Sequence, residues 1–361
     1  MPDQPRIELH DQWLRLHFGA EAPRHADYHY RWLRHNSDGD RHPTTGERLL
    51  CSSELPDRLT AQSAELVDGV LLVTWSDRRD RRDRRQSRYP LTWLREHAYA
   101  TERAAPPAPP NALARYEFFS TDDDLEVLAV EALQRVRSDG MVVVRHPREQ
   151  PENETEPLVA AFERTGVGIV ETHFGRIEDL RTDNTTNRNT DQLGYTDAAI
   201  QLHTDQPFLD RPPRYQILQS IRQADQGGEN FLVDARAASA YFQALDARDH
   251  ELLTSTPVRF LRQQKAFVSE VVSPILVLDG PRGFQIRYSY FTMAPHRVSF
   301  ERMGAWYRSY DAFARLCRDE RHQLRFRLAP GDFVLYDNLR MLHARTGFSG
   351  PRWVRGIYLD E

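Results

Sequence analysis

Two histidines and one carboxylate in this chain have the types and the spacing of a metal site. His203 and Asp205 stand two positions apart in "LHTDQPFLDRPP", and His343 lies in "GDFVLYDNLRMLHARTGF". In an extended strand, residues i and i+2 point to the same face, so His203 and Asp205 would converge while Thr204 points away. Two imidazoles and a carboxylate occupy one face of an octahedron and leave three positions open, which is typical of mononuclear Fe(II) oxygenases.

The composition excludes several classes of protein. Of the 361 residues, 40% are hydrophobic, enough for a sizeable core, and no apolar run approaches the ~20 residues of a membrane span. The charged N-terminus lacks the apolar stretch of a secretory signal, and two cysteines are too few for a disulfide framework or a four-cysteine zinc site. A net charge of −5 gives no global attraction to nucleic acid. We therefore expect a cytoplasmic protein that binds neither membranes nor nucleic acid.

The chain divides into two predicted domains joined by a linker. Residues 1–103 are typical of a small β-rich domain, with short strands at "LRLHF", "LVDGVLLVTW" and "SRYPLTWL". The run "DRRDRRDRR" at 77–85 could bind phosphate, but its mixed signs and its lack of aromatic residues favour a solvated hairpin loop. Residues 104–112 begin with "AAPPAPP" and form a stiff Pro/Ala linker, so residues 113–361 form the second domain.

The second domain is predicted to mix helices and strands. A helix in "STDDDLEVLAVEALQRVRSDG" would be capped by Ser120 or Thr121 and end at Gly140, and "MVVV" would follow as a buried strand. A second helix would end at Gly166, and further helices are expected near 237–253 and 299–318. The remaining segments suggest strands and long polar loops. This order indicates an α+β domain built on a sandwich or a barrel.

The sequence segments around the histidine-aspartate pair resemble those of a known family. By itself the pair is a weak signal, because a surface histidine and a turn-capping aspartate give the same letters. However, three segments in this order resemble the γ-butyrobetaine and trimethyllysine hydroxylases, within the wider TauD/TfdA-like 2-oxoglutarate dioxygenases. The segments are "HTDQPFLDRPPRYQILQSIRQADQGGENFLVDA", "GDFVLYDNLRMLHARTGF" and "PRWVRGIYLD". "YHYRWLRHN" and "SRYPLTWLREH" extend the resemblance into the N-terminal region.

The resemblance implies a fold, a reaction and a set of cofactors. The implied fold of the second domain is a double-stranded β-helix, or jelly-roll barrel, with the iron at its open end. The implied cofactors are Fe(II), 2-oxoglutarate as co-substrate, O₂, and ascorbate as reductant. In that chemistry 2-oxoglutarate is converted to succinate and CO₂ while an unactivated C–H bond of the substrate becomes an alcohol.

The resemblance also assigns residues to the iron and to the co-substrate. His203, Asp205 and His343 match the family's iron ligands. Arg352, in "PRWVRGIY", matches the arginine that grips the distal carboxylate of 2-oxoglutarate, and a guanidinium forms a two-pronged, charge-assisted pair with a carboxylate. Strand alternation alone cannot separate Arg352 from its competitors Arg345 and Arg355. Asn230 falls near the co-substrate, where its amide could donate a hydrogen bond, although a plain turn-side asparagine would look the same.

The expected substrate pocket departs from the family, whose best-known members grip a trimethylammonium group in an aromatic cage by cation–π interactions. Matching positions carry Phe174, Glu178, Tyr195 and Tyr358, with Glu178 where a cage tryptophan is expected. A carboxylate there would still favour a cation, and it would suit a primary or less methylated amine that donates hydrogen bonds. The alternative is a shifted register that leaves Glu178 in solvent. The substrate-carboxylate positions, asparagines in the family, read as Gln192 and as Ser289 or Tyr290, and Gln206 joins the expected pocket.

The N-terminal domain departs as well. Relatives often hold a zinc with a Cys-rich cluster after "WLRDN", whereas "WLRHNSDGDRHPTTGE" contains no cysteine and the later histidine position reads as Gln86 or a neighbouring residue. Without these thiolates a closed tetrahedral site cannot form, so we expect no structural zinc. The domain must then be held by its own core, for which the candidates are Trp32, Leu33, Trp75 and Trp93.

The sequence thus predicts a 2-oxoglutarate-dependent dioxygenase that hydroxylates a small cationic or zwitterionic metabolite, such as a betaine, an amino acid or an aminophosphonate. The same iron site could instead perform desaturation or oxidative N-demethylation. A different class, a non-catalytic jelly-roll scaffold for interactions, is disfavoured by the intact metal triad and Arg352. The family resemblance further implies a homodimer, for which the helices near 237–253 and 299–318 could form the interface.

Overall fold

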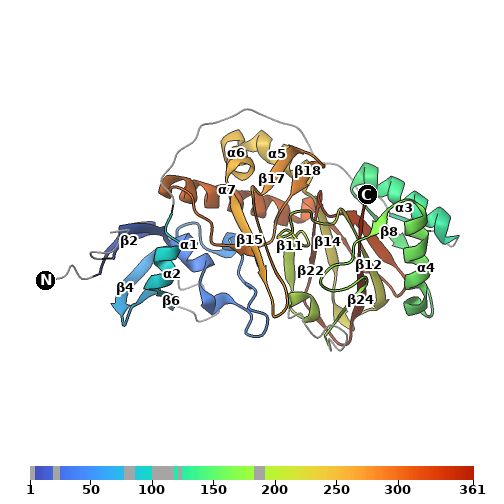
Figure 1. Cartoon of the computed structure of the whole chain (residues 1–361), viewed down its shortest axis with the longest axis horizontal. Coiled ribbons are helices and arrows are strands. Elements are labelled where there is room, and N and C mark those ends of the chain that lie inside the picture. The colour runs from blue at the N-terminus through green and yellow to red at the C-terminus, as the bar shows by residue number, and fades with distance from the viewer. Residues whose placement is uncertain (1–4, 19–24, 77–85, 100–117, 121–123, 183–191) are drawn as a thin grey trace.

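The chain combines helices with β-sheets, as the sequence predicts. The computed structural model describes residues 5–18, 25–76, 86–99, 118–120, 124–182 and 192–361. In Figure 1 the N-terminal elements lie at the left, and the sheets of the C-terminal part lie at the right. The arginine-rich run 77–85 and the linker at 104–112 lie outside the described residues, so the expectations for them stay predictions.

The N-terminal region contains two three-stranded antiparallel sheets, ordered β1-β2-β3 and β4-β5-β6, and two short helices. The strands are β1 (Arg6–Leu9), β2 (Trp13–His17), β3 (His25–His29), β4 (Ala61–Val67), β5 (Val70–Trp75) and β6 (Gln86–Pro90). The helices are α1 (Tyr30–His35) and α2 (Leu91–Glu96), with short 3₁₀ turns η1 (Asp38–Asp40) and η2 (Ser52–Glu54).

Two of the expected N-terminal strands need correction. "LVDGVLLVTW" is a hairpin and not one strand, because Asp68 and Gly69 adopt φ of 50° and 76°, as a two-residue hairpin turn requires. "SRYPLTWL" is the strand β6 followed by the helix α2, which starts directly after Pro90. Pro90 itself precedes the first helical position and has extended backbone, with a ψ of 137°, so the strand ends there.

The predicted N-terminal core is present and continues into the rest of the molecule. Trp32, Leu33 and Trp75 are buried, whereas Trp93 is partly buried and packs against them. The same hydrophobic cluster includes residues of the long helix α7 (Phe300–Arg318), among them Trp306. The apolar contacts therefore join the N-terminal region to the body that carries the metal triad.

The largest sheet among the described residues has seven strands. Its order is β10-β24-β12-β21-β8-β7, with β9 paired to β24, and only the β7–β8 pair among these is parallel. The strands are β7 (Phe118–Ser120), β8 (Met141–Arg145), β9 (Gly168–Ile169), β10 (Glu178–Arg181), β12 (Tyr215–Arg222), β21 (Phe333–Asp337) and β24 (Trp353–Asp360). The expected buried strand "MVVV" is β8.

Two helices cover the outer face of this sheet, α3 (Leu125–Asp139) and α4 (Pro151–Arg164). The expected cap of α3 at Ser120 or Thr121 is wrong. Asp124 caps this helix, because its carboxylate accepts the backbone N–H of Glu126 at 2.8 Å, and Ser120 belongs to β7. The predicted end at Gly140 is confirmed by its left-handed φ of 88°.

A four-stranded sheet, β11-β22-β14-β20, packs against the inner face of the large sheet. Its strands are β11 (Ile200–His203), β14 (Asn230–Asp234), β20 (Leu324–Phe326) and β22 (Met341–Arg345). Leu232 and Met341 pack with residues of the large sheet, whereas Phe231 and Val233 face the cluster that contains α7. This alternation leaves one face of the small sheet between the two sheets, where the metal triad lies.

The remaining elements pack around these sheets. They are α5 (Ala235–Leu245), α6 (Ala247–Ser255), η3 (Leu193–Tyr195), η4 (Glu320–His322), β13 (Gln226–Gly227) with β23 (Phe348–Ser349), β15 (Val258–Gln263) with β16 (Val268–Ser273) and β19 (Met293–Ala294), and β17 (Leu276–Gly280) with β18 (Gly283–Ile286). The helix expected near 237–253 is two helices, because Asp246 is extended and its carboxylate caps α6. The helix near 299–318 is confirmed as α7.

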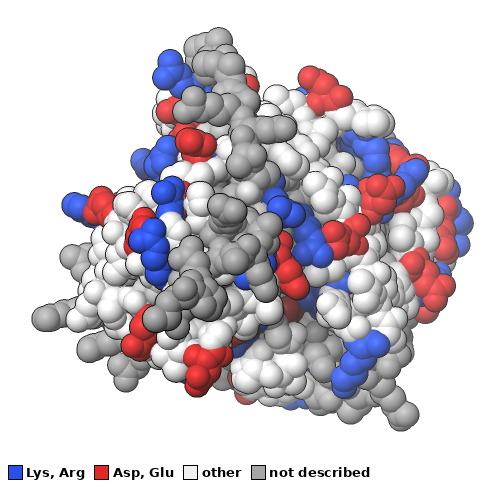
Figure 2. All heavy atoms as spheres, turned by 60° about the vertical axis from the view of Figure 1, so that its left-hand side comes forward, with Lys and Arg blue, Asp and Glu red and all other residues white. Residues whose placement is uncertain are grey.

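The surface carries charges of both signs. Figure 2 shows basic and acidic side chains side by side on the face turned forward there. Within the described ranges, every helix is too short or too polar to cross a lipid bilayer.

Candidate active site

The metal triad is assembled by one strand pair and the turn that follows it. β11 ends at His203, and the antiparallel register places His203 directly opposite His343 on β22. Asp205 lies just beyond the end of β11, so the extended geometry assumed from the sequence holds only as far as His203. Thr204 does point away, since its hydroxyl accepts the backbone N–H of Tyr288 at 3.0 Å.

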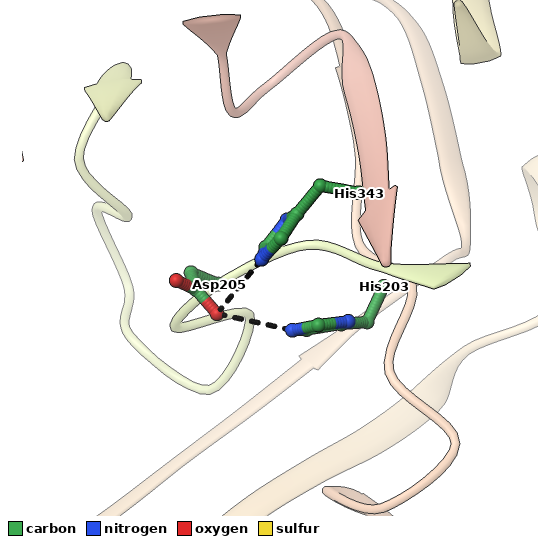
Figure 3. A group of neighbouring side chains, drawn as sticks. All are labelled: His203, Asp205 and His343. Atoms are coloured by element: carbon green, nitrogen blue, oxygen red, sulfur yellow. Dashed lines mark ion pairs between the residues drawn. The ribbon is translucent and has the colours of Figure 1, made fainter. Parts of the chain in front are cut away.

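The three side chains converge on one point, as Figure 3 shows. Asp205 Oδ1 lies 3.3 Å from His203 Nε2 and 3.9 Å from His343 Nε2. All three potential ligand atoms lie within 4.8 Å of one another. The sequence prediction that these residues meet is therefore confirmed.

Neighbouring groups fix the orientation of the triad. His203 Nδ1 lies 2.8 Å from the carbonyl oxygen of Gln201, which leaves Nε2 for a metal. Tyr358 donates its hydroxyl to Asp205 Oδ2 at 2.8 Å, away from the Oδ1 that faces the histidines. The side chain of Asn338 makes two hydrogen bonds to the backbone of Asp205. It accepts from the N–H at 2.8 Å and donates to the carbonyl oxygen at 3.0 Å.

The protonation states suit metal ligands. Burial, together with the neighbouring His203, lowers the pKa of His343 to about 3, so its imidazole is neutral at physiological pH. Burial raises the pKa of Asp205, but His343, His203 and the Tyr358 hydroxyl outweigh this effect and hold the pKa below its usual value. A neutral imidazole and an ionised carboxylate are the forms that bind a divalent metal.

The donor set fits Fe(II). Two imidazole nitrogens and one carboxylate oxygen on a single side of a point leave other positions for exogenous ligands. His343 Nδ1 is buried without a hydrogen-bond partner in the described part of the chain. No second group of three or more His, Cys, Asp or Glu side chains with metal-binding geometry occurs within the described ranges. The expected lack of a structural zinc stays a prediction.

The structure distinguishes Arg352 from its two competitors. Arg345 donates to the carbonyl oxygens of Thr196 at 2.9 Å and Ala198 at 2.7 Å. Arg355 pairs with Asp179 at 3.0 Å and donates to Thr155, beneath α4. Both guanidinium groups are therefore already engaged within the protein.

Arg352 has a different environment. It is buried, it lines the cavity beside the triad, and its guanidinium lies 5.4 Å from the ring centre of Phe348. Among the described residues it has no hydrogen-bond or ion-pair partner, and burial together with Arg345 lowers its pKa to about 9. Asn230, on β14, is also buried and lines the same cavity. An unpaired buried guanidinium is a ready receptor for a carboxylate.

The cavity lies between the two sheets and contains most of the expected pocket residues. Phe174, Glu178, Gln192, Gln206 and Tyr358 all line it, together with the three residues of the metal triad. Glu178 is buried, so the alternative that left it in solvent is wrong.

Among the described residues, Glu178 has no ion-pair partner. Its Oε1 accepts hydrogen bonds from the Tyr195 hydroxyl at 2.9 Å and from the Gln192 amide, and both donors are neutral. Burial and the charge of Asp205 together raise the pKa of Glu178 to about 8, against the opposing effects of Tyr195, Gln192 and Arg262. The empty site therefore favours the protonated acid at neutral pH, and a cation bound beside Glu178 would favour its ionised form.

Gln206 is strained and unsatisfied at the same cavity. Its backbone adopts a φ of 54°, unusual for a residue other than glycine. Both polar atoms of its side-chain amide are buried without a partner in the described part of the chain. Strain and unmade hydrogen bonds of this kind gather at binding sites, where a ligand supplies the missing partners.

Three expected pocket residues, Tyr195, Tyr290 and Ser289, do not line the cavity. Tyr195 touches it only through its hydrogen bond to Glu178. Tyr290 lies behind β11, where its hydroxyl accepts the backbone N–H of Gln201 at 3.3 Å, and the next residue, Phe291, lines the cavity instead. Phe291 packs edge-on against the His203 ring at 5.1 Å. Ser289 is buried and also lies outside the lining.

Sequence reasoning missed four residues of the site: Glu47, Arg262, Phe291 and Asn338. Glu47 and Arg262 come from distant segments. Glu47 ends the stretch "WLRHNSDGDRHPTTGE", which was compared with the family only for zinc ligands, and Arg262 lies outside the segments that carry the resemblance. Asn338 could have been suspected, because it sits in the same "YDNLRMLH" segment that carries His343.

Comparison with known proteins agrees with this geometry. Residues 106–358 match the sequence model of the taurine catabolism dioxygenase TauD, TfdA family. A γ-butyrobetaine dioxygenase of Pseudomonas sp. (strain AK-1) is 29% identical over 353 residues, covering 93% of this chain and 88% of that protein. A mitochondrial trimethyllysine dioxygenase of Gallus gallus is 24% identical, covering 98% of this chain and 84% of that protein.

Among solved structures, a taurine dioxygenase from Burkholderia xenovorans is 14% identical with a TM-score of 0.49, covering 70% of this chain and 90% of that one. The family match spans both sheets, the metal triad and Arg352. The chain therefore belongs to the TauD/TfdA family and is an Fe(II)- and 2-oxoglutarate-dependent dioxygenase.

Proposed function

We propose that this enzyme hydroxylates an aliphatic C–H bond of a small metabolite that carries an amine with at least one N–H group. The observation that supports this proposal is Glu178, a buried carboxylate on the cavity wall whose hydrogen-bond donors are both neutral. The other product is succinate, formed with CO₂ from 2-oxoglutarate.

His203, Asp205 and His343 are the proposed ligands of Fe(II), within a body that we interpret as a double-stranded β-helix. When bound, the iron supplies the O₂-dependent oxidising chemistry that 2-oxoglutarate decarboxylation drives. Arg352 would pair with the distal carboxylate of 2-oxoglutarate, and Asn230 would donate an amide hydrogen bond to it. Tyr358 and Asn338 would hold Asp205 in its binding orientation.

The amine end follows from the chemistry of Glu178. The relatives are named for γ-butyrobetaine and trimethyllysine, whose quaternary nitrogens carry no N–H. A carboxylate gains most from a cation that also donates hydrogen bonds, because charge-assisted bonds are stronger than neutral ones. Phe174 and Tyr358 supply aromatic walls near this carboxylate, and Tyr195 contributes its hydroxyl. The pocket therefore suits a primary, secondary or tertiary ammonium group better than a quaternary one.

The setting of the enzyme is also part of the proposal. The interspersed charges in Figure 2 support a protein that does not bind nucleic acid, and we infer a cytoplasmic location. A homodimer is inferred from the family resemblance, with α5 in the interface, since Leu245 at its end is 61% exposed. Light scattering of the purified protein tests the dimer.

Succinate formation by the purified enzyme tests the proposed substrate class. The assay contains Fe(II), ascorbate and 2-oxoglutarate, with a methylation series from 4-aminobutyrate to γ-butyrobetaine and with lysine, trimethyllysine and aminoalkylphosphonates. We expect amines with N–H groups to stimulate turnover more than their quaternary analogues. In Glu178→Gln this preference is lost, whereas Glu156→Gln, at an exposed surface ion pair, leaves it unchanged.

Rapid turnover of a quaternary amine would contradict the proposed substrate class. Turnover of γ-butyrobetaine at on the order of 1–10 s⁻¹ would contradict the proposed selectivity, particularly if Glu178→Gln did not reduce it. Mass analysis of the product separates hydroxylation from desaturation and from N-demethylation, because each changes the substrate mass differently.

A further inference from the structure

One carboxylate from the N-terminal region reaches the active-site cavity. Glu47 follows the 3₁₀ turn η1, is 5% exposed, and lines the cavity that holds the metal triad. Its Oε1 forms an ion pair with Arg262 Nη1 on β15, and its Oε2 accepts the backbone N–H of Leu193. The N-terminal region therefore builds part of the pocket wall.

Glu47 is held firmly in this position. The next residue, Arg48, is buried and donates to the carbonyl oxygens of Met293 and Tyr290 and to Asn36 Oδ1 at 2.6 Å. These contacts fix the backbone on which Glu47 stands, so its carboxylate is presented to the cavity without freedom to withdraw into solvent.

A chain of polar contacts connects Glu47 to Glu178. Arg262 is also 5% exposed and lines the cavity, and its Nη2 donates to Gln192 Oε1 at 3.4 Å. The Nε2 of the same Gln192 donates to Glu178. Gln192 thus connects Arg262 to Glu178. The Nε of Arg262 is buried without a hydrogen-bond partner among the described residues.

The charges along this chain are balanced at one end only. The negative charge of Glu47 offsets the positive charge of Arg262, whereas the ionised form of Glu178, which a bound cation favours, has only neutral hydrogen-bond donors. If Glu47 lost its charge, the guanidinium of Arg262 would carry an unbalanced positive charge beside Gln192 and Glu178. In a poorly solvated pocket, that charge would attract Glu178 and compete with an incoming ammonium group.

We propose that Glu47 is a specificity-determining residue: by neutralising Arg262, it reserves Glu178 for the ammonium group of the substrate. This inference rests on the proposed role of Glu178. It assigns to the N-terminal region a direct part in choosing between cationic and anionic ligands. Without the charge of Glu47, the cavity becomes more favourable to an anion and less favourable to a cation.

Calorimetric titration of the holoenzyme tests the inference without turnover. Anaerobic protein with Fe(II) and 2-oxoglutarate is titrated separately with butylamine and with butyrate, which share size and shape but differ in charge. Wild type is expected to prefer butylamine. Glu47→Gln keeps the shape and one acceptor, so it should weaken butylamine binding by at least about tenfold and strengthen butyrate binding.

Two further variants separate the charge effect from a structural one. Glu47→Gln combined with Arg262→Gln removes both charges and should restore butylamine affinity to within about threefold of wild type. Arg262→Gln alone should bind butylamine at least as tightly as wild type, and it tests the inference even if Glu47→Gln folds poorly. Asp38→Asn, at an exposed N-terminal carboxylate, is the matched control and should change neither affinity.

The outcomes discriminate between the two proposals. Affinities in Glu47→Gln that stay within about twofold of wild type for both ligands would overturn the role of Glu47. A double variant as impaired as Glu47→Gln would do the same, because the loss would then come from structure and not from the charge of Arg262. Wild type that binds no butylamine, beside a Glu47→Gln variant that gains butyrate, would overturn the role of Glu178 while supporting that of Glu47.

Discussion

Replacement of Arg352 by glutamine is expected to weaken 2-oxoglutarate binding without destabilising the fold. The guanidinium is buried beside the metal triad and has no hydrogen-bond or ion-pair partner in the described part of the chain. Its pKa is lowered to about 9, which reflects the cost of keeping this charge out of water, next to Arg345. Removing the guanidinium therefore removes the free-energy cost of burying its charge in the folded protein. It also removes the group that would bind a carboxylate.

The size of the effect follows from the pairing that is lost. Loss of one partner of a buried, hydrogen-bonded charge pair costs about 2–5 kcal/mol. This corresponds to a rise in KM for 2-oxoglutarate on the order of 30-fold to several thousand-fold. The free energy of unfolding without 2-oxoglutarate should not fall, because glutamine replaces a buried cation that the protein leaves unpaired.

Arg355→Gln is the matched control. Arg355 lies on the same strand, but it is bonded to Asp179 and Thr155. Its replacement should lower the free energy of unfolding by about 1–3 kcal/mol and leave the KM for 2-oxoglutarate unchanged. Succinate release as a function of 2-oxoglutarate concentration and urea denaturation measure the two quantities. A KM for Arg352→Gln within about twofold of wild type, or a large rise in Arg355→Gln, would refute the assignment of Arg352.

Three further predictions concern single residues of the site and the core. Tyr358→Phe removes the hydroxyl that bonds Asp205 Oδ2 and should weaken Fe(II) affinity about tenfold, measured by equilibrium dialysis; unchanged affinity would count against this role. Gln206→Ala should raise the KM of the amine substrate without lowering the melting temperature, because its buried amide has no protein partner among the described residues; a loss of stability alone would contradict this. Burial lowers the pKa of His296 to about 4, from its ordinary value of 6.5. Between these two pH values His296 is protonated in the unfolded chain but not in the folded chain. Stability should therefore fall by up to about 3 kcal/mol as the pH drops from about 6.5 to about 4, and urea denaturation of wild type and His296→Phe should show a smaller decrease in the variant.

The metal triad was predictable from the sequence because its geometry is largely local. His203 and Asp205 are two residues apart, and one strand pairing brings His343 opposite His203. The sequence could not reveal that β11 ends at His203 and that Asp205 is held beyond it by Asn338, 133 positions away. That support comes from a tertiary contact: Asn338 stands near His343 in the sequence, but nothing near Asp205 signals that it binds there.

The arginine that faces the cavity needed the structure. Arg345, Arg352 and Arg355 are indistinguishable by type, and alternation along a strand does not separate them. Their partners do, because Arg345 and Arg355 are already bonded within the protein. Arg345 and Arg352 both line the cavity, but among the described residues Arg352 has no hydrogen-bond or ion-pair partner. Glu47 and Arg262 were missed for a related reason, since their ion pair joins residues 215 positions apart.

Helix boundaries were set by competing local hydrogen bonds. The sequence offered Ser120 and Thr121 as caps of α3, but Asp124 is closer to the apolar periodicity, and its carboxylate accepts the N–H of Glu126. Asp246 likewise interrupts the helix expected near 237–253, because capping α6 requires an extended backbone at that residue. The presence of each helix was predictable from the spacing of apolar residues. The position of its ends depended on which polar side chain accepts a hydrogen bond from a free backbone N–H.

Binding of Fe(II) tests whether His203, Asp205 and His343 hold the iron. Wild type, His203→Ala, His343→Ala and the control His25→Ala, at an exposed histidine, are dialysed anaerobically against Fe(II) in the presence of 2-oxoglutarate. We expect a single iron per chain in wild type and in His25→Ala, and a loss of Fe(II) affinity by at least about tenfold in the other two variants. Iron bound with wild-type affinity by His203→Ala and His343→Ala would contradict this assignment, because the metal would then lie elsewhere in the chain.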